Sequence, residues 1–359
     1  MTMRERMLAV IQGRAVDRVP FVQYSDIAGP GTDRAAQALL GRERIGFSRW
    51  TSVHAYDTPN CGFERQEFAR NGRRGERFLL HTPKGTLTSE RIIEPALGTS
   101  AAARHFVQDP RDYETLLAYL RDIRVYEHLD PLEQTVCDLG DEGLPHISTP
   151  RTPYQQLWVE WVNIQDLAQH LCDLPDLLEE VTATLFDIQD RVYAVVRDAA
   201  RKTFVPYVVV GDNITAPMIG ETYFRRYCLP SYRKLAEALD DTGQDIPVVV
   251  HMDGDLKPLW QAIGESRVRG LDSMSPPPDN DTSVGDALRM WPEMRVLVNF
   301  PSSIHLQPPE AIYAKAMEIL EEGGRTGRLQ IQISENLPPD AWRTSYPAIV
   351  QAIDDFGGG

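Results

Sequence analysis

The feature that most constrains the fold is a regular alternation of long helical segments with short apolar segments in the C-terminal half. Helical periodicity predicts helices within residues 175–202, 221–243 and 308–324. The β-rich segments between and after them are "FVPYVVVGD", "IPVVVHMD", "GLDSMSP", "RVLVNF" and "LQIQISEN". Alternating strands and helices indicate a parallel sheet, and continuously apolar strands indicate burial on both faces. We therefore expect an α/β fold, a (β/α)8 TIM barrel.

The N-terminal half is less regular, and we expect it to elaborate that barrel. Residues 2–13 have the apolar spacing of a short amphipathic helix, and "DRVPFVQY" after it predicts a first strand. Between about residues 57 and 153 the pattern predicts a hairpin turning at Lys84-Gly85 and a helix in "RDYETLLAYLRDI". We expect a single barrel domain over residues 1–359, with 57–153 as its decorated region.

Polar residues gather where the predicted strands end, which is where barrel enzymes carry their chemistry. These residues are Asp212-Asn213, His251-Met252-Asp253, Ser275, Asn299 and Ser334-Glu335-Asn336. Side chains two residues apart in a strand point the same way, so His251 and Asp253 project together. Glu335 ends a later strand and could return as a third metal ligand. The alternative is a hydrogen-bonded histidine at the rim beside an ordinary "DGD" turn.

Motifs spread over most of the chain resemble the uroporphyrinogen decarboxylase superfamily. "RERMLAVIQGRAVDRVPF" is similar to the opening of that superfamily, R-E-R-x-x-x-A-x-x-G-x-x-x-D-R-x-P. "GDNITAPMIGETYFRRYCLPSY" resembles its strand ending in Gly-Asp-Asp and the helix P-x-x-F-R-x-Y-x-x-P-x-Y. Further matches are "PYQQLWVEWVNIQDLAQHLCDLPDLLEEV" and "SENLPPDAWRTSYPAIVQAI".

Within that superfamily, the motifs resemble most the corrinoid-dependent methyltransferases, which bind zinc through His-x-Cys and a later Cys-x-x-P-P. His251 matches the histidine, Asp253 the first cysteine and Glu335 of "ENLPP" the second. Oxygen donors in place of both thiolates still allow zinc or another divalent cation, but they are less suited to thiol methylation. The resemblance then implies a metal-dependent methyltransferase that moves a methyl group from a small methoxylated substrate, with aromatic compounds as one class, to a corrinoid on a partner protein.

The resemblance also suggests roles for residues near the barrel mouth. Asp212 is a candidate to orient His251 or reach the metal, or else it caps the next helix. His54 and Glu160 are candidate proton donors or acceptors, or else solvated or structurally paired residues. Candidates to contact substrate, each with a structural alternative, are Tyr56, Tyr154, Trp158, Trp161 and Asn299.

Two other functions stay open. One is metal-independent decarboxylation of a tetrapyrrole, for which relatives use an R-Q-A-G-R loop, whereas this chain has no arginine between Arg18 and Arg34. The other is a non-catalytic barrel that binds a ligand or the corrinoid protein, which the loss of both cysteines favours.

The composition of the chain limits the classes of partner that it is expected to bind. With 37 Lys and Arg against 52 Asp and Glu, the net charge of −15 disfavours nucleic acid and anionic membranes. The four cysteines form no pair with metal or disulfide spacing, and no segment approaches ~18 continuous apolar residues or resembles a signal peptide. We expect a cytoplasmic protein, and a homodimer is compatible with the sequence.

Overall fold

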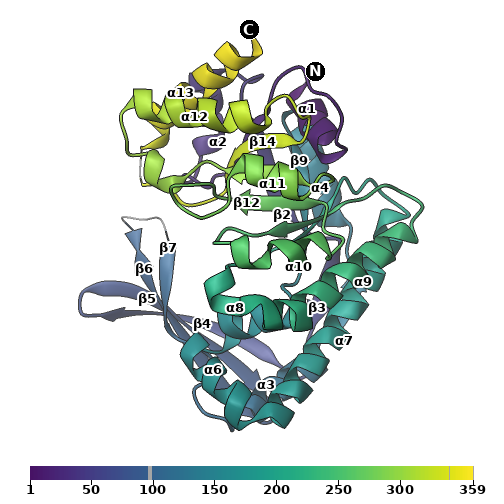
Figure 1. Ribbon diagram of the computed structural model, residues 1–359. Coiled ribbons are helices and arrows are strands. Elements are labelled where there is room, and N and C mark those ends of the chain that lie inside the picture. The colour runs from purple at the N-terminus through teal and green to yellow at the C-terminus, as the bar shows by residue number, and fades with distance from the viewer. Residues whose placement is uncertain (96–98, 339, 359) are drawn as a thin grey trace.

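The computed structural model describes residues 1–95, 99–338 and 340–358, and its centre is a closed barrel of eight parallel strands (Figure 1). Around the barrel the strand order is β1-β14-β13-β12-β11-β10-β9-β2. The predicted (β/α)8 barrel is therefore confirmed. Its strands are β1 (Phe21–Tyr24), β2 (Gly46–Thr51), β9 (Gly143–Thr149), β10 (Val208–Val210), β11 (Val248–His251), β12 (Gly270–Met274), β13 (Arg295–Asn299) and β14 (Leu329–Ile333).

Most of the helices connect these strands and cover the outside of the barrel. The helices that follow β1 are α2 (Thr32–Leu40), α3 (Asp112–Asp122), α4 (Asp130–Leu139), α5 (Pro153–Gln156), α6 (Ile164–Asp173), α7 (Pro175–Ala200), α8 (Ala216–Tyr223), α9 (Leu229–Asp240), α10 (Trp260–Gly264), α11 (Val284–Met290), α12 (Pro309–Gly323) and α13 (Trp342–Gly357). Helix α3 packs instead on the sheet inserted after β2 and on α7. Two π-helical segments, η3 (Leu157–Trp161) and η4 (Phe224–Cys228), continue α5 and α8. The helices predicted within 175–202 and 308–324 are α7 and α12, whereas the predicted helix 221–243 is divided among α8, η4 and α9.

Helix α1 (Met3–Ile11) closes the N-terminal end of the barrel. Thr2 and Glu5 form a capping box at its start. Its apolar residues Met3, Met7 and Ile11 pack in one cluster with inward-facing strand residues such as Val209 and Val249. Because this end is filled by apolar side chains, polar inward-facing residues are left for the opposite end, where the strands finish.

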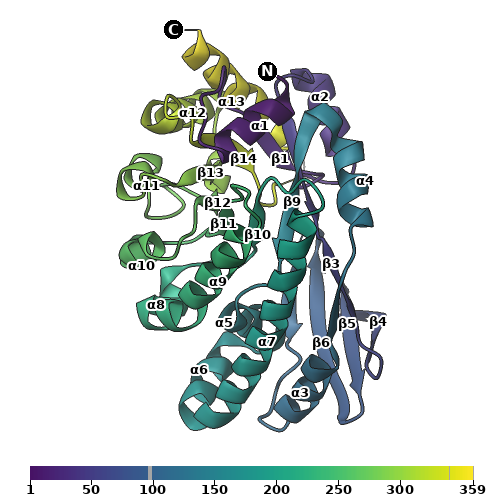
Figure 2. The same cartoon turned by 90° about the vertical axis from the view of Figure 1, so that its right-hand side faces the viewer.

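Residues between β2 and α4 form an insertion outside the barrel. A two-stranded sheet pairs β3 (His54–Asp57) with β8 (Arg124–Glu127), and a four-stranded antiparallel sheet contains β4 (Gly62–Arg70), β5 (Arg73–Thr82), β6 (Gly85–Glu94) and β7 (Thr99–Arg104). Figure 2 shows these strands running beside α3 and α7. The predicted hairpin is β5–β6. The region expected to decorate the barrel, about 57–153, also contains α4 and β9, which belong to the barrel itself.

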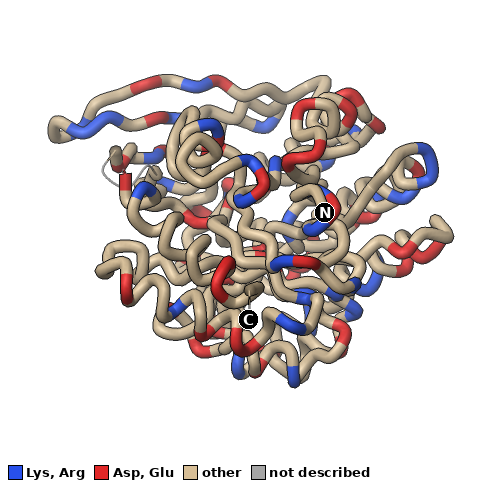
Figure 3. Tube along the Cα trace, turned by 90° about the horizontal axis from the view of Figure 1, so that it is seen from above, with Lys and Arg blue, Asp and Glu red and all other residues tan. Residues whose placement is uncertain are grey.

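The surface carries charges of both signs. Acidic and basic residues are interspersed along the trace, without separation into two halves (Figure 3). Within the part of the chain that the structure describes, no helix combines the length and apolarity that crossing a membrane requires.

Candidate metal centre

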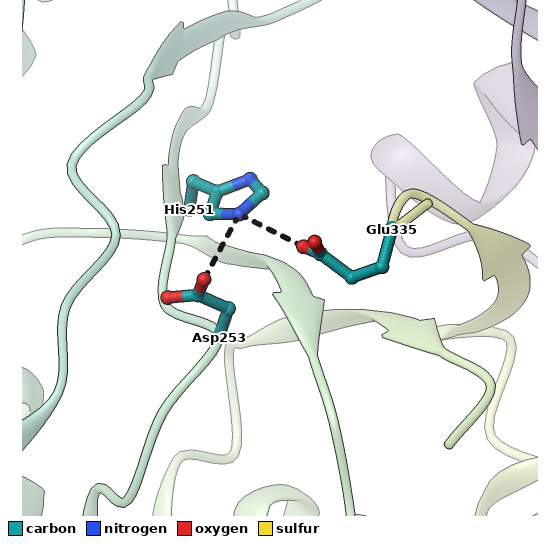
Figure 4. A group of neighbouring side chains, drawn as sticks. All are labelled: His251, Asp253 and Glu335. Atoms are coloured by element: carbon teal, nitrogen blue, oxygen red, sulfur yellow. Dashed lines mark ion pairs between the residues drawn. The ribbon is translucent and has the colours of Figure 1, made fainter. Parts of the chain in front are cut away.

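Three side chains from the ends of β11 and β14, which β12 and β13 separate in the barrel, point toward one another (Figure 4). His251 is the last residue of β11, Asp253 follows in the loop, and Glu335 follows β14. The Nε2 atom of His251 lies 3.6 Å from Asp253 Oδ2 and 3.6 Å from Glu335 Oε1. One ligand atom from each of the three residues lies within 4.8 Å of the other two. The residues that the sequence analysis proposed as metal ligands are thus brought together.

The glycine in "HMDGD" allows the loop that carries Asp253 to approach the loop after β10. A Cβ on Gly254 would lie 2.1 Å from the Cβ of Thr215 and 2.9 Å from its Cα. Backbone hydrogen bonds join the two loops, from Gly254 N to Ile214 O at 3.1 Å and from Ile214 N to His251 O at 3.2 Å. The small residue therefore lets two loops pair tightly and fixes the position of the carboxylate.

A fully buried carboxylate orients the imidazole from behind. Asp272 in β12 lies opposite His251 in the strand register, and its Oδ2 lies 3.2 Å from His251 Nδ1. It also accepts hydrogen bonds from the Tyr24 hydroxyl and, at 2.7 Å, from Gln332 Nε2. Burial raises the pKa of Asp272, but the charges of His146 and His251 and the hydrogen bonds with His251 and Tyr24 lower it to about 2. An ionised carboxylate on Nδ1 leaves Nε2 for a ligand, as is common for metal-bound histidines.

The structure gives this orienting role to Asp272 and not to Asp212, which corrects the sequence hypothesis. Asp212 is also fully buried, but its Oδ1 accepts a hydrogen bond from Thr152 N at 2.6 Å and its Oδ2 accepts one from the Tyr232 hydroxyl. Nor does Asp212 cap the following helix, because the N-cap of α8 is Thr215. Asp212 instead holds the backbone where α5 begins.

The Asp253 carboxylate is held by the residue next to Asp212. Asn213 adopts a left-handed backbone conformation, with φ of 55°. Its Nδ2 donates to Asp253 Oδ2 at 3.1 Å, and its Oδ1 accepts from Arg151 Nη2 at 2.8 Å. Burial raises the pKa of Asp253, but the contacts with His251 and Asn213 outweigh this and lower it. Asp253 is therefore an ionised oxygen donor, connected through Asn213 to an arginine.

The geometry of the three residues fits a divalent cation. Among the described residues, the buried Nε2 of His251 has no hydrogen-bond partner, and 3.6 Å to each carboxylate is longer than a normal hydrogen bond. Ligands at about 2.0–2.1 Å from zinc in tetrahedral geometry stand roughly 3.4 Å apart, which is close to that separation. Burial lowers the pKa of His251, but the facing carboxylates of Asp253, Asp272 and Glu335 raise it well above its usual range. This excess of negative charge favours a bound cation.

Four other candidate residues line a cavity of about 300 Å³ beside the end of β9: His54, Tyr56, Glu160 and Trp161. Burial lowers the pKa of His54 to about 4, and its Nε2 lies 3.1 Å from the Tyr56 hydroxyl. Burial raises the pKa of Glu160, whose Oε1 lies 3.7 Å from Arg151 Nη1. No contact joins these four residues to the metal triad directly among the described residues; Arg151 and Asn213 form the connection.

The remaining three candidates pack against, or form hydrogen bonds with, other residues of the protein. Tyr154 is buried and stacks on Tyr223 and Tyr227, with ring centroids 5.2 and 5.7 Å away. Trp158 donates to Gln155 Oε1 at 2.7 Å. Asn299 is buried, and its Oδ1 accepts from Ser334 N at 3.1 Å. Neither the Tyr154 ring nor the Trp158 ring lines the 300 Å³ cavity, so both have a structural role. Asn299 fixes the end of the strand that carries Glu335.

One aromatic residue at the barrel mouth, Trp50, was not among the predicted site residues. The Trp50 side chain at the end of β2 contacts the His146 ring, with centroids 3.9 Å apart and the planes tilted by 36°, and it meets Tyr24 edge-on at 5.6 Å. Trp50 is 43% exposed although its neighbours His146 and Tyr24 are buried. The signal was the period of two in "GFSRW", which places Ser48 and Trp50 on one face of the strand.

Comparison with known proteins identifies the family. The family model for uroporphyrinogen decarboxylase matches residues 175–355, which is half of the chain and includes all three residues of the triad. The chain belongs to this family. A solved structure described as a methyltransferase from Methanosarcina mazei matches with a TM-score of 0.59 and 14% identity over 99% of both chains, which supports the fold. A glycoside hydrolase family 5 enzyme from Prevotella bryantii has a TM-score of 0.44 at 7% identity, over 99% of both chains. No curated protein matches the sequence significantly.

Proposed function

We propose that this family member is a metal-dependent methyltransferase that moves a methyl group from a small methoxylated substrate to a corrinoid carried by a partner protein. The observation that carries the proposal is the convergence of His251, Asp253 and Glu335: the Nε2 atom of His251 has no hydrogen-bond partner among the described residues and lies 3.6 Å from an oxygen of each carboxylate. The likeness to a methanogen methyltransferase, as that structure is described, agrees with it.

A divalent cation held by these three residues would polarise the ether oxygen of the substrate and stabilise the negative charge that develops on it. A reduced corrinoid on the partner protein would supply the nucleophile that accepts the methyl group, and the electron pair of the broken C–O bond would remain with the oxygen. The chain itself therefore supplies no nucleophile. Its own residues bind and orient: Asp272 fixes His251, Asn213 fixes Asp253, and Trp50 offers an exposed aromatic face at the barrel mouth.

The first test is metal content. The purified protein is expected to hold about one equivalent of zinc or another divalent cation, and His251→Ala is expected to lose it. His81→Ala is the matched control, because His81 lies on the exposed sheet and its imidazole pairs with Glu64 at 3.4 Å. Metal-free wild-type protein with no affinity for added zinc would refute the proposal and favour a non-catalytic barrel.

The second test is the reaction. Methoxylated compounds are incubated with zinc-loaded protein and a reduced corrinoid, and cobalt absorbance reports methyl transfer. Transfer by the wild type and its loss in His251→Ala are expected. Decarboxylation is the second candidate, favoured by the description of the family model. It would require no metal, so turnover of a tetrapyrrole carboxylate that survives His251→Ala would establish it instead.

A further inference from the structure

A second cavity, of about 400 Å³, lies between the four-stranded sheet and the barrel, and it concentrates positive charge. Arg91 of β6, Arg104 of β7 and Arg151 after β9 line it, against a single carboxylate, Glu160. Its volume falls in the range of cavities that bind small molecules, roughly 300–1,000 Å³. In a chain with a net charge of −15, three guanidinium groups around one cavity form a local reversal of charge.

Two of these arginines differ from the others in the same sheet. Every arginine of β4 and β5 forms an ion pair with a glutamate of the sheet, and these pairs are Arg65–Glu76, Arg70–Glu90, Arg73–Glu94, Arg74–Glu67 and Arg77–Glu90. Arg91 and Arg104 form no ion pair with any residue that the structure describes, although they lie on neighbouring strands. Their guanidinium groups are therefore available to an anion from outside the chain.

The third arginine connects this cavity to the triad. Arg151 donates to Asn213, which donates to Asp253, so two hydrogen bonds separate the cavity from a metal ligand. The buried Nε of Arg151 has no partner among the described residues. A Cβ on Gly211 would lie 3.5 Å from the Trp50 ring and 4.0 Å from Arg151 Nη1, so Trp50 and Arg151 flank the same glycine.

The cavity wall also carries three phenylalanines, beside the polar side chains of Ser89 and His105. Phe63, Phe78 and Phe106 line it, and the Phe63 ring stands edge-on to Phe106 with centroids 6.2 Å apart. A lining that combines three arginines with three phenylalanines suits a ligand with a flat apolar body and a carboxylate.

We propose that the substrate of the metal centre is an aromatic carboxylate, bound by Arg91, Arg104 and Arg151 through its carboxylate and by the phenylalanine wall through its ring. This inference rests on the proposed function and adds the substrate class: a methoxylated benzoate rather than a neutral methoxyarene. The guanidinium groups bind and position the substrate, and they take no part in breaking the C–O bond.

The test is calorimetric binding of 4-methoxybenzoate and of 4-methoxybenzamide, which has nearly the same shape but no charge. The wild type is expected to bind the carboxylate at least tenfold more tightly than the amide. Arg91→Gln and Arg104→Gln are each expected to weaken carboxylate binding about tenfold and to leave amide binding unchanged, because each removes one charge-assisted hydrogen bond. Arg74→Gln is the matched control, since Arg74 is in the same sheet, 73% exposed and paired with Glu67.

Because a carboxylate could also bind the metal cation, a His251→Ala variant shows whether the preference for the carboxylate comes from the arginines or from the metal. The preference for the carboxylate is expected to persist in this variant. Equal binding of acid and amide, a preference untouched by both arginine substitutions, or a preference lost in His251→Ala would each overturn the inference. Carboxylate-selective binding without methyl transfer would refute the proposed function and leave this binding site standing. Methyl transfer from amide and acid with equal efficiency would refute the site and leave the function.

Discussion

Replacing Asp272 with asparagine tests whether the imidazole is oriented from behind as the structure indicates. Asparagine keeps an acceptor for the Nδ1–H of His251 but loses the charge that balances a metal-bound imidazole. Asp272 is fully buried and held by Tyr24 and Gln332, so the shape of the site should survive the change. Removal of such a supporting carboxylate typically costs 10- to 100-fold in metal affinity, which is about 1.4–2.7 kcal/mol.

The control is Asp212→Asn, because the two residues match closely. Both carboxylates are fully buried near strand ends, and both accept a hydrogen bond from a tyrosine hydroxyl. Asp212 contacts the backbone of Thr152 rather than His251, so its substitution should lower stability without changing zinc affinity. Competition with a chromophoric chelator measures the affinity, and urea unfolding measures the stability. Wild-type zinc affinity in Asp272→Asn, or an equal loss in Asp212→Asn, would refute the assignment.

Three further outcomes are expected. Gly254→Ala should lower both zinc affinity and stability, the latter by about 1–3 kcal/mol in urea unfolding, because its Cβ would overlap Thr215 and displace the Asp253 loop; unchanged zinc affinity would contradict this. Burial lowers the pKa of His305 to about 4, below its unfolded value of about 6.5. The unfolded state therefore binds more protons between these two values, and the protein loses stability as the pH is lowered through them. From pH 7 to pH 5 the wild type should lose about 2 kcal/mol more than His305→Leu, and parallel profiles from urea unfolding would show otherwise. The double variant Asp253→Cys with Glu335→Cys should bind zinc and cadmium more tightly in chelator competition, since thiolates are softer donors; weaker cadmium binding would contradict the proposed ligand set.

The barrel and the triad could be predicted because each depends on short-range patterns. Continuous apolar segments such as "IPVVVH" that alternate with long helices are typical of buried strands, and parallel strands bring their C-terminal ends to one side. His251 and Asp253 share a direction because side chains alternate along a strand. The prediction of Glu335 as a third ligand required only the position where its own strand ends. These inferences require no knowledge of how the strands are staggered.

Asp272 could not be predicted because its role depends on register. Its pairing with His251 across β11 and β12 is set by how the closed barrel staggers its strands, and no local pattern encodes that stagger. A single acidic residue within the apolar segment "GLDSM" was the only signal. Asp212 was the nearer candidate in sequence, yet its carboxylate accepts from Thr152 and Tyr232.

The insertion was harder still, because its place on the barrel depends on tertiary contacts. The β5–β6 hairpin was predicted from alternation and turn residues. That Arg91 and Arg104 face Arg151 across a cavity depends on how the sheet packs against the barrel, and the link to Asp253 depends on the left-handed conformation of Asn213.

The carboxylates around the triad and the guanidinium groups of the arginines have opposite effects on an anionic substrate. Asp253, Glu335 and the buried Asp272 place three carboxylates around one imidazole, and a divalent cation would balance only two of these charges, so the site offers an aromatic carboxylate little net attraction. Placing the carboxylate among Arg91, Arg104 and Arg151 moves that charge to the far side of Asn213. The uncharged methoxy end is then the part that can enter the mouth beside Trp50. Substitution of the arginines should therefore raise the KM of an anionic substrate and leave the KM of a neutral one unchanged, whereas loss of the triad should abolish turnover of both.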